Sequence, residues 1–178
     1  MARTDPKDID LLVLDVDGVL TDGTVNLGPD GAEIKAFHVR DGSGIKYWRR
    51  AGRKVAFLTG RSSPAVDRRA EELGVDAVRQ GAKDKLPALE EMLSQLGAAA
   101  ERTAVVGDDL PDLPMMLRCG FAACPADAVD EVRARADYVA AAAGGRGCVR
   151  EIIEMLLKSA GLWEGILSRY FPGEGARP

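Results

Sequence analysis

Two aspartates, Asp15 and Asp17, follow the apolar run Leu11–Leu14 and precede Gly18. The run is typical of a strand buried on both faces of a parallel sheet, which places the two carboxylates at or just beyond its carboxyl end. Side chains alternate along a strand, so both carboxylates would share one side. They would repel each other unless a proton or a cation intervened, and Mg²⁺ prefers such oxygen ligands. An acidic turn after an ordinary strand is the alternative interpretation.

Two further apolar runs, residues 55–58 and Thr103–Val106, also end in polar groups. Thr59 and Gly60 follow the first run, and Lys85 opens a predicted helix between the two runs. Because the carboxyl ends of parallel strands meet at one edge of a sheet, we expect these groups to converge near Asp15 and Asp17. Three more carboxylates follow the second run, namely Asp108, Asp109 and Asp112.

This combination of groups suits the transfer of a phosphoryl group. Mg²⁺ and a lysine neutralise phosphoryl charge, while a hydroxyl and backbone amides hold its oxygens. An aspartate can attack phosphorus to form an aspartyl-phosphate, and a second aspartate can protonate the leaving oxygen and then activate water. His38 is the only histidine, which argues against a His-dependent triad or a multi-histidine metal site. The residues therefore predict a Mg²⁺-dependent phosphatase.

A bacterial receiver domain is a rival for the same set of groups. It also gathers an acidic pair, a phosphorylated aspartate, a hydroxyl and a lysine on a parallel sheet. Its phosphorylated aspartate follows a later strand, however, and the corresponding position here carries Thr59. The sequence favours the phosphatase.

Strand and helix patterns alternate along the chain, which predicts an α/β fold: a Rossmann-like parallel sheet with helices on both faces. The 178 residues fit one domain, residues 1–178, of which about 1–7 and 172–178 are expected to be flexible. Residues 24–27 and 34–38 flank a Pro-Asp-Gly turn and predict a β-hairpin that projects from the edge carrying Asp15 and Asp17.

Several smaller elements are also predicted from local patterns. A helix is expected to contain Ile45 and end near Gly52, and another is expected over residues 126–136. Residues 144–147, Gly-Gly-Arg-Gly, predict a flexible break before a final helix over residues 148–160.

Composition limits the possible partners. The chain is 46% hydrophobic and 29% charged, with a net charge of −4, which argues against a nucleic-acid partner. It has no apolar run long enough to cross a bilayer, and its first residues lack the apolar core of a signal peptide. Three cysteines without a CxxC pair suggest reduced thiols. We therefore expect a cytoplasmic protein that binds no membrane.

With these residues in view, the sequence resembles the haloacid dehalogenase superfamily of phosphatases. The resemblance rests on four motifs in order: residues 15–19, Thr59, Lys85 and residues 107–112. It implies that Asp15 is the nucleophile and Asp17 the general acid and base. Mg²⁺ would be held by the Asp15 carboxylate, the Asp17 backbone carbonyl and Asp108. Thr59 and Lys85 would hold the phosphoryl group, with Asp109 and Asp112 supporting the metal ligands or Lys85.

The gap between the first two motifs fits only a hairpin and one helix, so no cap domain is expected. Residues 17–23, 37–42 and 144–147 resemble a capless branch of tetrameric enzymes that dephosphorylate an eight-carbon sugar acid phosphate for lipopolysaccharide synthesis. This implies a homotetramer with sites at subunit interfaces, in the cytoplasm of a Gram-negative-type bacterium. The substrate contacts it implies are Asp17, His38, Val39, Arg40, Asp41, Gly42, Lys46, Gly60, Arg61, Arg69 and Lys85. A phosphatase acting on a nine-carbon sugar acid phosphate and a non-catalytic tetramer of the same fold remain as alternatives.

Overall fold

A computed structural model describes residues 4–171 of the chain. The flexibility predicted for residues 1–3 and 172–178 therefore lies outside the described residues. Within the described part, a short 3₁₀ helix, η1 (Pro6–Asp8), precedes the first strand, and Asp5 accepts the backbone N–H of Lys7 at its start.

The centre of the fold is a six-stranded sheet in the order β5-β4-β1-β6-β7-β8, and every neighbouring pair is parallel. β1 lies in the middle, where Leu14 is opposite Phe57 of β4 and Val106 of β6. The predicted α/β sheet is therefore confirmed. Its strands are β1 (Leu11–Leu14), β4 (Lys54–Leu58), β5 (Ala77–Arg79), β6 (Thr103–Val106), β7 (Phe121–Cys124) and β8 (Tyr138–Val139).

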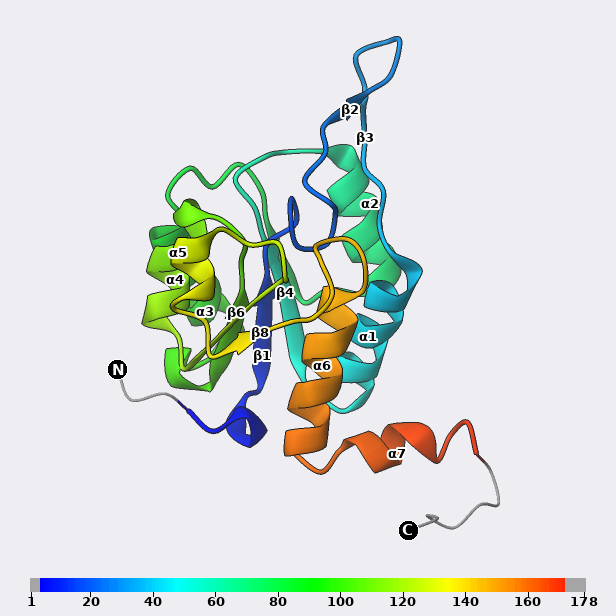
Figure 1. Ribbon diagram of the computed structural model, residues 1–178, viewed down its shortest axis with the longest axis vertical. Coiled ribbons are helices and arrows are strands. Elements are labelled where there is room, and N and C mark those ends of the chain that lie inside the picture. Colours follow the sequence, from blue (N-terminus) through cyan, green and yellow to red (C-terminus); the bar gives the residue numbers. More distant parts are fainter. Residues whose placement is uncertain (1–3, 172–178) are drawn as a thin grey trace.

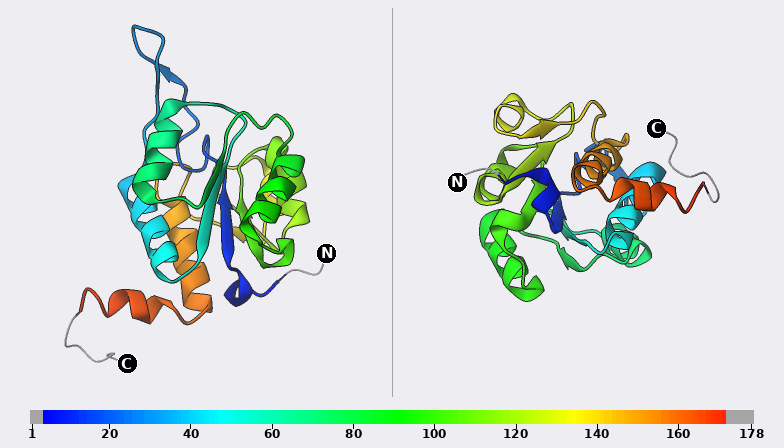
Figure 2. Two further views of the ribbon diagram at one scale, coloured as in Figure 1. Left: turned by 180° about the vertical axis from the view of Figure 1, so that it is seen from behind. Right: turned by 90° about the horizontal axis from the view of Figure 1, so that it is seen from below.

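Helices cover both faces of this sheet (Figures 1 and 2). One face carries α1 (Val39–Arg50), α2 (Pro64–Leu73) and α6 (Cys148–Ser159); the other carries α3 (Lys85–Leu96), α4 (Leu113–Arg118) and α5 (Asp130–Arg133). The side chains of β1 alternate between the two faces of the sheet. Leu12 and Leu14 therefore belong to the first core, and Leu11 and Val13 belong to the second. The first core includes the aromatic residues Trp48, Phe57 and Phe121, whereas the second is aliphatic with buried methionines and cysteines; burial of these apolar side chains is the main stabilising term of the fold.

Two more 3₁₀ turns and one short helix complete the described elements: η2 (Ala100–Arg102), η3 (Leu110–Asp112) and α7 (Trp163–Leu167). α7 lies at the end of the molecule opposite the hairpin (Figure 1). Among residues 4–171, no helix combines the length and the apolar character needed to cross a membrane.

The predicted hairpin is present but shorter than expected. β2 (Asn26–Leu27) and β3 (Glu33–Ile34) pair antiparallel as a separate two-stranded sheet, which projects beyond the carboxyl edge of the main sheet (Figure 1). Between β1 and β4 the chain forms only this hairpin and α1, as expected for a fold without a cap.

Helix α1 contains Ile45 as predicted; it starts at Val39 and includes two glycines, Gly42 and Gly44. The absence of a Cβ at these glycines lets side chains and backbone of neighbouring helices approach closely. A Cβ at Gly42 would lie 2.2 Å from Arg69 Nη2, and one at Gly44 would lie 3.1 Å from the Arg150 Cα in α6. Tight packing against α2 and α6 therefore outweighs the low helix propensity of glycine.

The prediction of one helix over residues 126–136 was wrong, because only α5 (Asp130–Arg133) is an α-helix there. The backbone N–H groups just before and after α5 donate hydrogen bonds to other segments. Val129 N–H donates to the Asp108 carbonyl, 3.0 Å away, and Asp137 N–H donates to the Ala122 carbonyl, 2.8 Å away. These bonds tie the segment to the site loop at one end and to the sheet at the other.

Candidate active site

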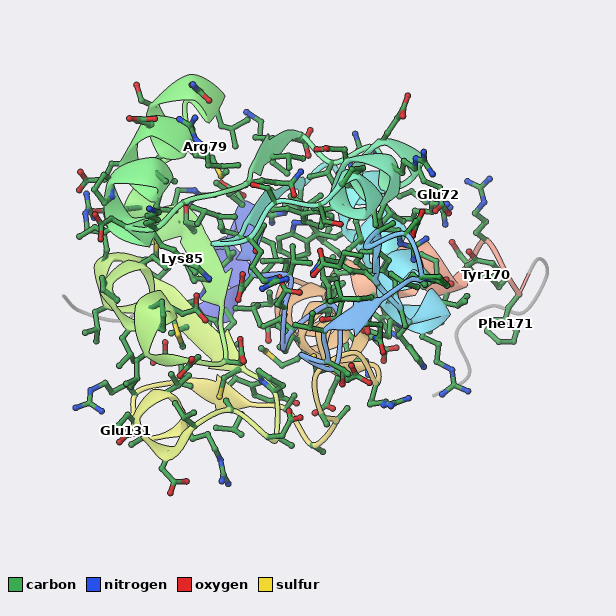
Figure 3. The ribbon with its side chains drawn as sticks, turned by 90° about the horizontal axis from the view of Figure 1, so that it is seen from above. Glu72, Arg79, Lys85, Glu131, Tyr170 and Phe171 are labelled. Atoms are coloured by element: carbon green, nitrogen blue, oxygen red, sulfur yellow. The ribbon has the colours of Figure 1, made fainter. Side chains whose placement is uncertain are left out.

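The carboxyl ends of β1, β4 and β6 meet at a pocket of about 290 Å³. Figure 3 looks down on this edge of the sheet and labels Lys85. The structure therefore brings together the groups that the four motifs singled out. The pocket is lined by Asp15, Asp17, Thr59, Gly60, Arg61, Ala82, Lys83, Lys85, Asp108, Asp109, Pro111 and Asp112.

Lys85, the first residue of α3, lies between two buried carboxylates. Its Nζ is 2.9 Å from Asp15 Oδ1 and 2.5 Å from Asp112 Oδ1. Burial alone would lower the pKa of Lys85, but the two carboxylates outweigh burial and raise it. The ammonium is therefore held in its charged form, ready to attract an anionic group.

Asp112 organises the loop after β6. Its Oδ2 accepts the backbone N–H groups of Asp108 at 2.9 Å and Asp109 at 3.2 Å, while its Oδ1 accepts from Lys85. Asp109 turns its carboxylate onto its own loop, where it accepts the Leu110 N–H at 2.8 Å. Gly107 leaves the room for this arrangement, because a Cβ there would lie 2.3 Å from the Asp112 Cβ.

Three carboxylates at the bottom of the pocket fit a divalent cation. One oxygen from each of Asp15, Asp108 and Asp112 lies within 4.8 Å of the others, and Asp108 Oδ1 is buried without a hydrogen-bond partner. Burial, followed by the charges of Asp15 and Asp112, raises the pKa of Asp108 to about 8. Burial also raises the pKa of Asp15. A hard cation such as Mg²⁺ would remove this repulsion and satisfy the free oxygen.

Gly18 makes space for the same cluster. It has φ +88°, and a Cβ built on it would lie 2.0 Å from Asp108 Oδ2. The glycine after the acidic pair is therefore needed both for its backbone conformation and for the position of a carboxylate 90 residues later in the chain.

The raised pKa of Asp108 predicts how the stability of the metal-free protein depends on pH. A carboxyl group whose pKa rises on folding, here from 3.8 to about 8, stabilises the fold at low pH and loses that contribution as the pH rises. In EDTA, we expect the Tm at pH 8 to be lower than at pH 5.5 by roughly 5 °C. Thermal unfolding measured with and without Mg²⁺ checks this, and Mg²⁺ should restore more stability at pH 8. An equal pH response in Asp108→Asn would contradict the assignment.

The carboxylate of Asp17 points away from this cluster. Thr59 Oγ1 donates to Asp17 Oδ2 at 3.5 Å, and Asp17 Oδ1 is ion-paired with Lys35 of the hairpin exit. Only the side chains of Asp15, Asp108 and Asp112 therefore form the acidic trio, and the expected Mg²⁺ contact from Asp17 would be its backbone carbonyl.

Sequence reasoning missed Lys35 and its neighbour Glu33. Lys35 Nζ is also 3.4 Å from Glu33 Oε1, and that oxygen lies 2.7 Å from Arg61 Nη2. The signal was present, because residues two apart on an extended segment share one side and these two carry opposite charges. Nothing in the local pattern showed that this side would face Asp17.

Asp41 occupies a structural position. It is buried, and its carboxylate accepts the backbone N–H groups of Gly147 at 3.2 Å and Arg150 at 2.8 Å, which caps the start of α6. His38 is at the N-cap of α1, with its Nδ1 3.8 Å from Asp41 Oδ2. Neither residue lines the pocket around Asp15.

A second cavity of about 670 Å³ lies between the hairpin exit and α2, and two of the remaining predicted substrate contacts, Val39 and Arg69, line it. Arg69 borders it, pairs with Glu72 at 2.7 Å and lies over the Phe37 ring at 5.7 Å. Lys46 is 3.8 Å from Glu72, and Gly42 contacts Arg69 as described above. Within one chain, the structure does not bring these residues to Asp15. The same holds for the exposed Val39 and Arg40.

Residues 144–147, expected to be a flexible break, instead pack against the loop that follows β1. Gly145 N–H donates to the Val19 carbonyl at 2.9 Å, and Arg146 Nη2 is 3.1 Å from Asp22 Oδ2. A Cβ at Gly144 would lie 1.9 Å from the Gly18 carbonyl oxygen. The glycines therefore permit two backbones to touch, which is the physical reason for the Gly-Gly pair.

Replacing Gly144 with alanine is expected to displace the loop of residues 16–23, because the new methyl group has no room. We expect a loss of roughly 2 kcal/mol or more of unfolding free energy, as is typical of overpacking. Urea denaturation measures this. Gly165→Ala is a control without the clash, since no atom lies within 4 Å of a Cβ at that position of α7 and its φ is not positive. A loss for Gly144→Ala no larger than for Gly165→Ala would contradict the close contact.

Comparisons with known proteins agree with this geometry. The family model for haloacid dehalogenase-like hydrolases matches residues 34–120. The 3-deoxy-D-manno-octulosonate 8-phosphate phosphatase KdsC of Escherichia coli K12 is 46% identical over 155 residues, which is 87% of this chain and 82% of that protein.

Two solved structures bear on the metal site. The Moraxella catarrhalis 3-deoxy-D-manno-octulosonate 8-phosphate phosphatase, in complex with magnesium, phosphate and KDO, is 40% identical with a TM-score of 0.91, covering 93% of this chain and 95% of that one. The cobalt-bound Haemophilus influenzae deoxy-D-mannose-octulosonate 8-phosphate phosphatase is 41% identical with a TM-score of 0.86, covering 89% and 92%. The chain therefore belongs to the haloacid dehalogenase superfamily and, within it, to the 3-deoxy-D-manno-octulosonate 8-phosphate phosphatase family.

Proposed function

We propose that the chain hydrolyses 3-deoxy-D-manno-octulosonate 8-phosphate to the free sugar acid and phosphate, with Mg²⁺, as a step towards lipopolysaccharide. The observation that carries the proposal is the pocket itself. It combines a buried carboxylate trio with Lys85 and with a separate carboxylate, Asp17, on the same strand end. Membership of the family supports the choice of substrate.

Each residue of the pocket has a separate role in the proposed reaction. Asp15 attacks phosphorus and carries the phosphoryl group, while Lys85, Thr59 and the amide of Gly60 bind its oxygens. Asp17 protonates the sugar oxygen as it leaves and then takes a proton from the water that hydrolyses the aspartyl-phosphate. The carboxylates of Asp15 and Asp108 and the Asp17 carbonyl would hold Mg²⁺, which would supply positive charge beside the transferring phosphoryl group.

Asp109 and Asp112 act through other groups. Asp112 holds Lys85 and the backbone of the Asp108 loop, and Asp109 caps η3. Asp41 is given a structural role at the start of α6 in place of the substrate contact that the resemblance implied.

The working form is a cytoplasmic homotetramer of one-domain chains, with sites at subunit interfaces. Exposed apolar side chains on the hairpin support assembly, among them Leu27, which is 68% exposed. The cations set apart from Asp15, such as Arg40, Lys46 and Arg69, would then meet substrate bound to a neighbouring copy. Sedimentation of the wild type and of Leu27→Glu tests the assembly. A wild type that sediments as a monomer would refute it.

Phosphate release from a panel of substrates tests the proposed activity. The panel contains 3-deoxy-D-manno-octulosonate 8-phosphate, a nine-carbon sugar acid 9-phosphate and common hexose phosphates, each assayed with Mg²⁺ and with EDTA. We expect a strong, metal-dependent preference for the first. Preference for the nine-carbon compound would overturn the substrate and keep the chemistry, whereas no turnover of any compound would overturn both.

A further inference from the structure

Lys35 is a buried cation that the proposed reaction does not use. Its side chain is only 3% exposed, although Lys35 directly follows a hairpin that is largely exposed. Its ammonium is paired with Asp17 and lies 3.4 Å from Glu33. Burying an ammonium is costly unless its partners are well placed, so its position at this point needs a reason.

The place of Lys35 between two cavities supplies that reason. It lines the 670 Å³ cavity between the hairpin exit and α2, and its partner Asp17 lines the 290 Å³ pocket that holds Asp15 and Lys85. In the proposed reaction, the phosphoryl group occupies the smaller pocket. The ester oxygen that links it to the rest of the substrate must then lie on the open side of that pocket, beside Asp17.

The contacts of Asp17 define where its carboxylate can point. Thr59 Oγ1 reaches one oxygen from the sheet, and Lys35 holds the other from the hairpin. Thr59 also accepts the Arg61 N–H at 3.3 Å, so its hydroxyl is itself fixed. Without Lys35, one Asp17 oxygen would lose its ion-pair partner, and Glu33 would keep its ion pair with Arg61 but lose the one with Lys35.

We propose that Lys35 is a positioning residue for Asp17, which it holds against the ester oxygen at the boundary of the two cavities. This rests on the proposed phosphatase function and extends it to the hairpin. Glu33 and Arg61 support Lys35 by fixing the hairpin exit beside the pocket. Lys35 itself makes and breaks no bond in the reaction.

Two substrates whose leaving groups differ in their need for a proton distinguish this positioning role from a general loss of structure. A sugar alkoxide must receive a proton as it leaves, so its departure depends on the position of Asp17. The nitrophenolate of p-nitrophenyl phosphate leaves as an anion and does not need that proton. The first step with p-nitrophenyl phosphate is read directly as the burst of nitrophenolate.

The experiment compares Lys35→Met and Lys35→Arg in the full chain with Mg²⁺. The substrates are p-nitrophenyl phosphate and the sugar phosphate that the wild type hydrolyses best. We expect Lys35→Met to lower kcat for the sugar phosphate by about 10²-fold, with its nitrophenolate burst rate within about threefold of the wild type. Lys35→Arg, which keeps the charge, should recover much of the loss. Lys7→Met, on an exposed lysine of η1, is the matched control.

Three results would overturn the proposal. Equal losses on both substrates would show that Lys35 supports the fold of the site as a whole. A higher KM with unchanged kcat would make it a substrate-binding residue, and no change at all would make the ion pair incidental. Preference of the wild type for a different sugar phosphate refutes only the proposed substrate, because the Lys35 comparison is then made on that compound. Absence of any phosphatase activity refutes both.

Discussion

Replacement of Asp15 with asparagine should lower kcat by at least about 10⁴-fold, as for loss of a nucleophile in other enzymes that form covalent intermediates. Asparagine keeps the shape of the side chain but cannot attack phosphorus. Initial rates of phosphate release at saturating substrate measure the effect. Asp130→Asn is the matched control, because that carboxylate is 95% exposed on α5.

The same variant should remain folded. Asp15 is one of three carboxylates that crowd one another, so removing its charge relieves repulsion in the metal-free protein. We expect the Tm of Asp15→Asn in EDTA to equal or exceed that of the wild type. A variant that keeps more than about one hundredth of the wild-type kcat would exclude Asp15 as the nucleophile.

Removal of the metal is expected to lower the phosphatase rate by about 10³-fold or more, and added Mg²⁺ should restore it. Without a cation, the carboxyl groups of Asp15, Asp108 and Asp112 crowd the place of the anionic phosphoryl group, and the charge of Lys85 is shared between Asp15 and Asp112. Rates after dialysis against EDTA, followed by titration with Mg²⁺, measure the effect.

Asp108→Asn gives the residue-level version of this test. It removes the negative charge and replaces one oxygen of a carboxylate whose Oδ1 has no hydrogen-bond partner. The Mg²⁺ concentration for half-maximal activity should rise by roughly tenfold or more, because a hard cation binds a neutral amide oxygen less tightly than a carboxylate. Full activity in EDTA, or an unchanged Mg²⁺ requirement in Asp108→Asn, would rule out the proposed metal site.

The parts of the fold that could be predicted carry their signal locally. The apolar run of β1 is followed directly by Asp15, and that of β6 by Gly107 and then Asp108, so the pattern alone predicted both the sheet and the edge where Asp15 and Asp108 meet. Lys85 was also predicted correctly at the start of a helix, because the helical pattern that follows it is local. Parallel topology then brings these ends together without any knowledge of side-chain contacts.

The parts that could not be predicted depend on contacts between distant segments. Gly42 and Gly44 lie inside α1 because α2 and α6 pack closely against it, which glycine propensity does not reveal. Lys35 pairs with Asp17 only because the chain leaves the hairpin beside the strand end that carries Asp17. The sequence also did not reveal that the Asp41 carboxylate accepts the Gly147 N–H at the start of α6, 106 residues further along the chain.

The contact between residues 144–147 and the loop after β1 also bears on the order in which the protein folds. Arg146 and Asp22 are 124 residues apart in sequence, and Cys148 Sγ reaches the Val19 carbonyl across 129 residues. Closing a loop of that length has a large entropic cost that is recovered only when both segments are in place. The loop beside Asp15 and Asp17 therefore reaches its final shape only after most of the sheet has formed. During refolding, far-UV circular dichroism should recover before phosphatase activity, and a nascent chain that ends before α6 would carry Asp15 and Asp17 without the segment that packs against their loop.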